Sequence, residues 1–151
     1  MTKLDELKVI RDQLDSHPCA ITADPVYVFG RGYVDAQVMF VGEAPGAEEE
    51  ERGVPFVGAS GRLLHDLLGQ QGIDAYYIAN VLKCRPPFNR TPTENEVDCC
   101  FSFLLQQIDV VKPDLIVALG NTAWRALGPF PQTGVSAMRG RLFDFYSAHH
   151  T

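Results

Sequence analysis

A single glutamate follows a short apolar run and lies within a turn that is rich in glycine and proline. The apolar run covers residues 38–41, and the turn reads Gly42-Glu43-Ala44-Pro45-Gly46. Glycine and proline make such a turn tight, and backbone N–H groups remain free to face a ligand. A carboxylate held at this point can orient or deprotonate water, which is general-base chemistry. The alternative is a structural turn beside an acidic surface, because residues 48–51 are four more glutamates.

Two other side chains are of types that recognise nucleic-acid bases. Asn80 lies within a second apolar run, where its amide must find hydrogen-bond partners, and an amide matches the edge of a nucleobase. Phe56 lies in a glycine-rich loop, from which an aromatic ring can stack on a base. The structural alternatives are an asparagine bonded to the backbone and a phenylalanine in the core. Residues 58–61 open a helix whose free amides could bind a phosphate, or which Ser60 could cap.

The chain has four cysteines, Cys19, Cys84, Cys99 and Cys100, and no CxxC pair. A disulfide framework is not expected in a chain of this length without an export signal. The spacing does not predict a zinc ribbon. The count alone favours small buried apolar residues.

Composition predicts a soluble cytoplasmic protein of one domain. The chain has 151 residues, 46% of them hydrophobic, and a formal charge of −6. No apolar run approaches the ~18–20 residues of a membrane span, and the acidic N-terminus does not resemble a secretory signal. The negative charge argues against general coating of phosphates. A local basic face remains an alternative, formed by Lys83, Arg85, Arg90, Arg139 and Arg141.

Helical and strand patterns alternate along the chain. Helices are expected at residues 3–15, 60–70 and 93–112, with a short helix that Asn121 could cap and that extends through Leu127. Strands are expected at 38–41, 76–82 and 115–119, a weaker strand at 141–145, and a loop at 19–36. Thr93 and Glu96 have the spacing of a capping box. The alternation predicts an α/β domain with a parallel sheet. Ligands bind beyond the carboxyl ends of such strands, so Glu43 and Asn80 should meet at one edge.

Two long segments resemble the family 4 uracil-DNA glycosylases, the iron–sulfur type. They read GEAPGAEEEERGVPFVGASGRLL and NVLKCRPPFNRTPTENEVDCC, and the similarity extends from about Cys19 to Arg141. The resemblance implies a single domain over residues 1–151, a three-layer α/β/α sandwich with a small parallel sheet. It implies a monomeric repair enzyme that hydrolyses the N-glycosidic bond of a flipped-out deoxyuridine in DNA. The alternatives are a catalytically silent relative that binds nucleic acid or a partner, and a small-molecule nucleotide binder.

The resemblance also implies roles for particular residues. Glu43 matches the acidic residue that positions the hydrolytic water, Phe56 the ring that stacks on uracil, and Asn80 the amide that reads the pyrimidine edge. The backbone of Gly42 and Ala44 is expected to line the pocket.

The family holds a [4Fe–4S] cluster with four cysteines, and thiolates are the usual ligands of such clusters. Cys19, Cys84 and Cys100 match three of them, and Cys99 is expected to be a bystander. The first position of the family's CxxC pair falls on Ser16. The fourth ligand is then Ser16, His17 or water, or the cluster is absent or labile.

The family ends with a further strand and a His-Pro motif that stabilises the departing uracil. This chain ends Ser147-Ala148-His149-His150-Thr151, without the proline. The comparison predicts a truncated copy that lacks the last strand and is weak or inactive on its own.

Overall fold

The computed structural model describes residues 1–128 together with Leu142 and Phe145. The elements of this part are α1 (Lys3–Asp15), β1 (Arg31–Gly32), β2 (Val38–Gly42), α2 (Ala47–Arg52), α3 (Ala59–Gln70), β3 (Tyr76–Asn80), the 3₁₀ turn η1 (Pro87–Asn89), α4 (Glu94–Val111), β4 (Leu115–Ala118) and α5 (Asn121–Leu127). No helix in the described residues is long and apolar enough to cross a membrane. Most of the strand predicted at 141–145, and His149 and His150, lie outside the described residues.

The sheet has the strand order β1-β3-β2-β4. β2 is parallel to both β3 and β4, which confirms the predicted parallel arrangement of these three strands within a mixed sheet. β1 pairs antiparallel with β3 at the edge, in a segment predicted as loop, so that prediction is wrong for two residues. A strand of two residues has no periodic pattern to reveal it. Glycine is required at Gly32, because a Cβ there would lie 2.2 Å from the carbonyl oxygen of Tyr76.

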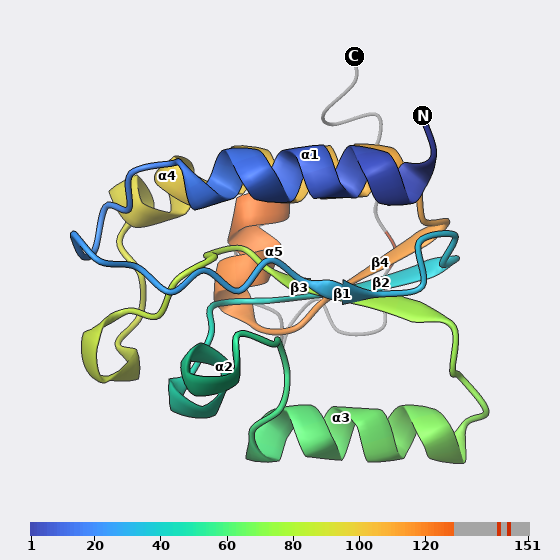
Figure 1. Cartoon of the computed structure of the whole chain (residues 1–151). Helices are drawn as coiled ribbons and strands as arrows, with labels where there is room; N and C mark the ends of the chain where they lie inside the picture. The colour runs from blue at the N-terminus through green and yellow to red at the C-terminus, as the bar shows by residue number, and fades with distance from the viewer. Residues whose placement is uncertain (129–141, 143–144, 146–151) are drawn as a thin grey trace.

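Helices cover both faces of the sheet, as Figure 1 shows with α1 and α4 above it and α2 and α3 below it. Side chains alternate between these layers along each strand. Met39 and Ala79 belong to the larger core cluster with α1 and α4. Phe40 and Ile78 belong to a smaller cluster with Leu68 of α3. The three-layer α/β/α sandwich is therefore confirmed.

The predicted helices form, but not every predicted cap does. At α4 the backbone N–H of Glu96 donates to Thr93 Oγ1 at 3.3 Å, and the backbone N–H of Thr93 donates to Glu96 Oε1 at 2.9 Å. This confirms the capping box. The cap of α3 is Gly58 rather than Ser60. The acidic run predicted as surface forms the short helix α2.

Candidate active site at the carboxyl ends of the strands

Gly42 and Asn80 are paired residues at the ends of β2 and β3. A Cβ built on Gly42 would lie 2.5 Å from Asn80 Oδ1 and 2.6 Å from Phe56 Cζ. The amide and the ring therefore both approach the α-carbon of Gly42. Asn80 is only 3% exposed. The structure thus brings together three of the residues predicted for substrate binding, and the absence of a side chain at Gly42 makes their approach possible.

The ring of Phe56 is held by an unusual backbone conformation. Phe56 has φ +56°, in the left-handed region, where a residue with a side chain is strained. A Cβ on Gly61 would lie 2.2 Å from the backbone carbon and oxygen of Phe56. Only glycine at position 61 permits this close contact. Phe56 is half-buried and packs against the smaller core cluster, so it is both a packing residue and a residue of the strand edge.

Glu43 follows β2 directly and is half-buried. The hydroxyl of Thr122, in α5, donates a hydrogen bond of 2.5 Å to Glu43 Oε2. The backbone N–H of Leu82 donates to the carbonyl oxygen of Glu43 at 3.0 Å, which extends the β2–β3 pairing past the strand ends. Glu43 thus lies at the same edge as Asn80 and is oriented by α5. Ala44 is half-buried, and its side chain packs against the larger core cluster.

Glu49, in α2, joins the two loops that carry Glu43 and Phe56. Its carboxylate accepts hydrogen bonds from the backbone N–H groups of Gly46 at 2.9 Å, Val57 at 2.9 Å and Gly58 at 2.6 Å. A carboxylate at the N-terminus of α3 is also favoured by the helix dipole. The Gly58 amide is therefore already bonded and is not free for a phosphate, which was one of the two alternatives for this helix start. The signal for Glu49 was its capping-box spacing after Gly46.

Lys83 is fully buried, which rules it out of the basic face that the sequence had left open as an alternative. Its ammonium donates to the carbonyl oxygens of Phe29 at 3.0 Å and Asn80 at 2.8 Å, and to Gln107 Oε1 at 2.6 Å. Burial lowers the pKa of Lys83 to about 7, and the nearby thiol of Cys100 acts in the opposite direction. Lys83 therefore ties the backbone of Asn80 to α4.

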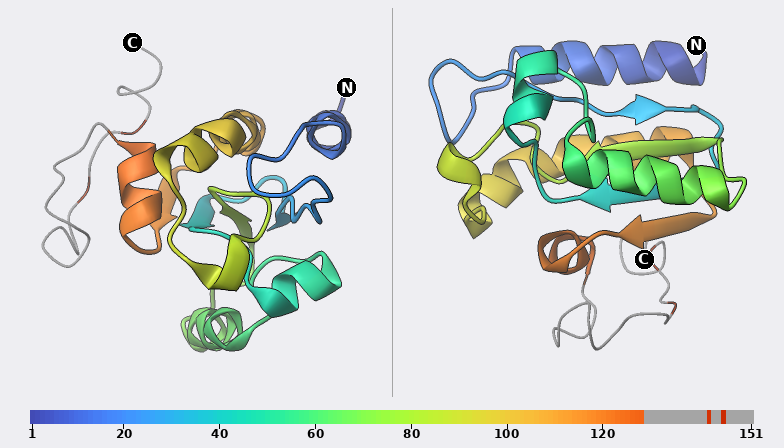
Figure 2. Two further views of the ribbon diagram at one scale, coloured as in Figure 1. Left: turned by 90° about the vertical axis from the view of Figure 1, so that its left-hand side faces the viewer. Right: turned by 90° about the horizontal axis from the view of Figure 1, so that it is seen from below.

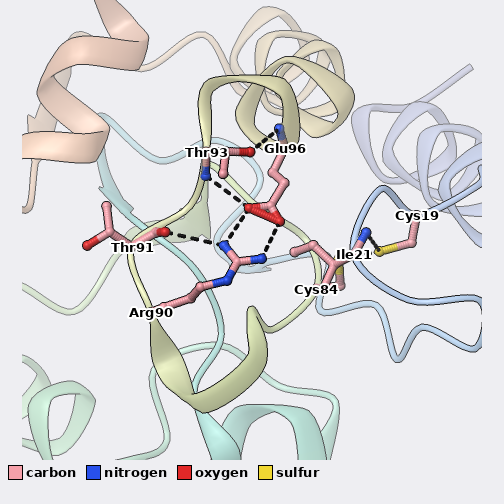
Figure 3. A network of polar contacts seen from close by, with 7 residues as sticks. All are labelled: Cys19, Ile21, Cys84, Arg90, Thr91, Thr93 and Glu96. Atoms are coloured by element: carbon pink, nitrogen blue, oxygen red, sulfur yellow. Dashed lines mark hydrogen bonds and ion pairs between the residues drawn. The ribbon is translucent and has the colours of Figure 1, made fainter.

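The described arginines do not support the alternative of a basic face either. Arg85 lies 3.7 Å from Glu50, and Arg90 makes two hydrogen bonds with Glu96, of 2.6 and 2.8 Å. These bonds hold the pKa of Glu96 down at about 2, although burial raises it. Figure 3 shows this ion pair with the capping residue Thr93. Both arginines are therefore partly neutralised, and Arg139 and Arg141 lie outside the described residues.

Three cysteines from separate segments lie together. The Sγ atoms of Cys19 and Cys84 are 2.8 Å apart, and Cys84 is hydrogen-bonded to Cys100. This bond and burial raise the pKa of Cys84 well above its usual range. The bond from Cys84 lowers the pKa of Cys100 to about 6, against burial, and the backbone and ammonium of Lys83 lower it further. The donor chemistry of these three thiols fits an iron–sulfur cluster.

The fourth ligand position is less well defined. Ser16 follows the last residue of α1, and its side chain is exposed. Cys99 Sγ lies 3.5 Å from His17 Nε2, and the same nitrogen lies 3.1 Å from the carbonyl oxygen of Cys99. Among the described residues, no group of three or more His, Cys, Asp or Glu side chains is arranged to hold a metal ion. The structure therefore places three matching thiols together without a completed ligand set.

Comparison with known proteins gives a consistent family. The family model of the uracil DNA glycosylase superfamily matches residues 29–150. A type-4 uracil-DNA glycosylase from Thermotoga maritima is 48% identical over 120 residues, covering 78% of this chain and 62% of the relative. The type-4 uracil-DNA glycosylase from Archaeoglobus fulgidus is 39% identical over 150 residues, covering 95% of this chain and 74% of the relative. The one from Pyrobaculum aerophilum is 46% identical over 129 residues, covering 84% of this chain and 64% of the relative.

The chain belongs to the uracil DNA glycosylase superfamily and, within it, to the type-4 uracil-DNA glycosylases. This confirms the resemblance drawn from the two motif segments. The chain spans less than two thirds of the length of two of these relatives and 74% of the third.

Proposed function

We propose that the protein is a DNA repair glycosylase that hydrolyses the N-glycosidic bond of a flipped-out deoxyuridine and releases uracil. The convergence of Asn80 and Phe56 on Gly42, at the strand edge where Glu43 begins the next loop, carries this proposal. An amide, an aromatic ring and a carboxylate are what a pocket for one extruded pyrimidine requires. Family membership supports the same reaction.

In this proposal Asn80 pairs with the edge of uracil and Phe56 stacks on its face. The Asn80 amide donates to the uracil O4 and accepts from the N3–H. Cytosine presents the opposite pattern, a donor at position 4 and an acceptor at N3, and leaves a buried amide unpaired. Sites that hydrogen-bond one partner in this way discriminate by about 10⁴- to 10⁵-fold. The burial of Asn80 therefore supports discrimination against cytosine.

Glu43 activates the water in the proposed reaction. The C1′–N1 bond breaks and its electron pair leaves with uracil. The water oxygen bonds to C1′ and gives its proton to the Glu43 carboxylate. The Thr122 hydroxyl occupies Oε2 of Glu43 and fixes the orientation of the carboxylate, which leaves Oε1 for the water. The negative carboxylate also stabilises positive charge on the sugar.

The test is uracil release from single-stranded and duplex oligonucleotides that contain one deoxyuridine. Glu43→Gln is expected to slow release by about 10²- to 10⁴-fold, the usual contribution of a general base. The control is Glu48→Gln, the same substitution on α2, at a carboxylate that forms a surface ion pair with Arg62. If the wild-type protein binds the oligonucleotides but releases no uracil, the proposed glycosylase activity is wrong, and the protein is instead a catalytically silent relative that binds nucleic acid.

We further propose that Cys19, Cys84 and Cys100 hold a [4Fe–4S] cluster. The gathering of these three cysteines from separate segments of the chain supports this assignment. Such a cluster would join the loop after α1, the loop after β3 and α4, which is a structural role. Anaerobically purified protein should contain iron and acid-labile sulfide, and Cys84→Ser should lose both, whereas Cys99→Ser should retain them. Wild-type protein without iron would contradict the proposal, and Ser16→Ala and His17→Gln test the fourth ligand.

We also propose that residues 1–151 belong to one domain, which acts on uracil-containing DNA as a monomer in the cytoplasm. The described residues share two core clusters on opposite faces of one sheet, which supports a single folding unit. Light scattering of the purified protein tests the monomer.

A further inference from the structure

The loop between β3 and α4 presents a phenylalanine to solvent. Phe88 is 98% exposed, the highest value among the large apolar side chains of the described residues. A single exposed apolar side chain is common in proteins and needs no explanation by itself. The backbone of this loop gives the second observation.

Phe88 and the next residue both have a left-handed backbone. Phe88 has φ +56° and ψ +25°, and Asn89 has φ +56°. Side chains strain this conformation, which glycine adopts freely. Strained positions of this kind cluster at ligand-binding sites, where the surrounding structure enforces them. The chain thus holds a phenylalanine, with its whole ring in water, at a position where glycine would be easier to accommodate.

The turn that carries Phe88 is held from both sides. Pro86 and Pro87 restrict the backbone before it. The backbone N–H of Asn89 donates to the carbonyl oxygen of Pro86 at 3.1 Å, and that of Arg90 donates to Pro87 at 3.2 Å. Arg85 Nε donates to Asn89 Oδ1 at 2.8 Å. The backbone is therefore already ordered before a ligand binds, which lowers the entropic cost of stacking.

The base of the loop is anchored as well. Arg90 makes its two hydrogen bonds to Glu96 in the first turn of α4, and the carboxylate of Glu96 is 8% exposed. The Arg90 side chain remains 44% exposed, so its outer edge can also face a phosphate. The Arg90–Glu96 pair thus fixes the loop to α4 directly after the turn that carries Phe88.

The loop lies at the same end of the molecule as the candidate active site. The left view of Figure 2 looks onto this end and shows η1, α2 and the start of α4 around the ends of the strands. Asn80 is the last residue of β3, and this loop follows it. A duplex that delivers a nucleotide to Asn80 therefore approaches the end of the molecule where this loop lies.

We propose that Phe88 is a DNA-stacking residue that contacts a base beside the extruded deoxyuridine; this inference rests on the proposed function. Extrusion of a nucleotide leaves a neighbouring base without its stacking partner. Apolar side chains inserted at base steps fill such gaps, and every base offers a π-face to an aromatic ring. Stacking of this kind does not depend on the base sequence around the uracil, as a repair enzyme requires because damage occurs in any sequence.

The test compares Phe88→Ala and Phe88→Trp with wild type. The probe is a duplex with one 2′-fluoro-2′-deoxyuridine, which resists hydrolysis, and a 2-aminopurine next to it. Loss of one stacked base is expected to weaken binding by about 5- to 140-fold. Phe88→Ala should therefore bind this much more weakly and alter the 2-aminopurine fluorescence of the complex. Phe88→Trp should bind like wild type.

The matched control is Tyr33→Ala. Tyr33 is also an exposed aromatic residue, at 57%, but its backbone N–H bonds to Tyr76, at the amino end of β3. This variant should bind the duplex like wild type. Because both side chains are exposed, neither substitution should prevent folding, and circular dichroism checks this.

The outcomes separate this proposal from the proposed function. Equal binding of wild type and Phe88→Ala to the duplex overturns the stacking role. A change of oligomeric state in Phe88→Ala, with unchanged DNA binding, overturns it in favour of a protein contact. If wild type releases no uracil but Phe88→Ala still weakens binding, the stacking role stands and the glycosylase activity fails.

Discussion

Gly42→Ala tests the geometry of the candidate active site with a single methyl group. The new Cβ would lie 2.5 Å from Asn80 Oδ1 and 2.6 Å from Phe56 Cζ, whereas ordinary contact begins at 3.4 Å. The amide and the ring must each retreat by about 0.8–0.9 Å, or the strand must shift. Gly42 has no positive φ, so alanine introduces no backbone strain of its own. The effect therefore reports only on crowding of the Asn80 amide and the Phe56 ring against Gly42.

Two magnitudes follow from this displacement. Overpacking at a well-filled position lowers the free energy of unfolding by about 1–3 kcal/mol. A catalytic or binding group misplaced by about 1 Å slows a reaction by roughly 100-fold. Urea unfolding measures the first, and single-turnover uracil release, under conditions where the variant stays folded, measures the second.

The matched control is Gly69→Ala, the same substitution within α3. A Cβ at Gly69 meets nothing within 4 Å. In a helix this change should raise the free energy of unfolding by about 0.5–1 kcal/mol and leave uracil release unchanged. If Gly42→Ala releases uracil and binds it as the wild-type protein does, the reasoning is refuted, because Asn80 and Phe56 would then not contact the base.

Three other positions allow tests of stability. Glu96→Gln should lower the free energy of unfolding by about 1–2 kcal/mol at neutral pH, because it breaks the ion pair with Arg90. Since the bonds from Arg90 lower the pKa of Glu96 to about 2, this contribution is fully present above the unfolded pKa near ~4.3 and is lost as the pH falls towards 2. The urea midpoints of wild type and variant should converge in acid, and a constant difference would contradict the ion pair. Lys83→Met should cost about 2–4 kcal/mol in urea unfolding, since it leaves buried acceptors, including the carbonyl of Asn80, without their donor; an equally stable variant would argue against this network. Phe88→Gly should raise stability by about 0.5–1 kcal/mol, because relief of left-handed strain exceeds the entropy cost of glycine, and a lower melting temperature would contradict the strain.

Local patterns predicted most of the elements. The capping box of Thr93 and Glu96 and the apolar faces of α1, α3 and α4 depend on residues close together in the chain. The unbroken apolar runs at β2 and β3 reflect strands that are covered on both faces. Because parallel strands end at one edge, the sequence also predicted that Glu43 and Asn80 lie at that edge. The sequence did not predict the edge strand β1, because a strand of two residues is too short to show an alternating pattern.

The sequence by itself determined the layers, the family and the edge where the chemistry lies. Only the tertiary structure decided which charged side chains are buried and which groups they bond. Glu49 looked like one of several surface glutamates, yet it bonds amides up to nine residues away. Lys83 looked exposed, yet its partners lie 54 and 24 residues away in the chain. A charged side chain can be buried only where folding collects enough partners around it, and no local pattern shows which distant carbonyl and amide groups will arrive there.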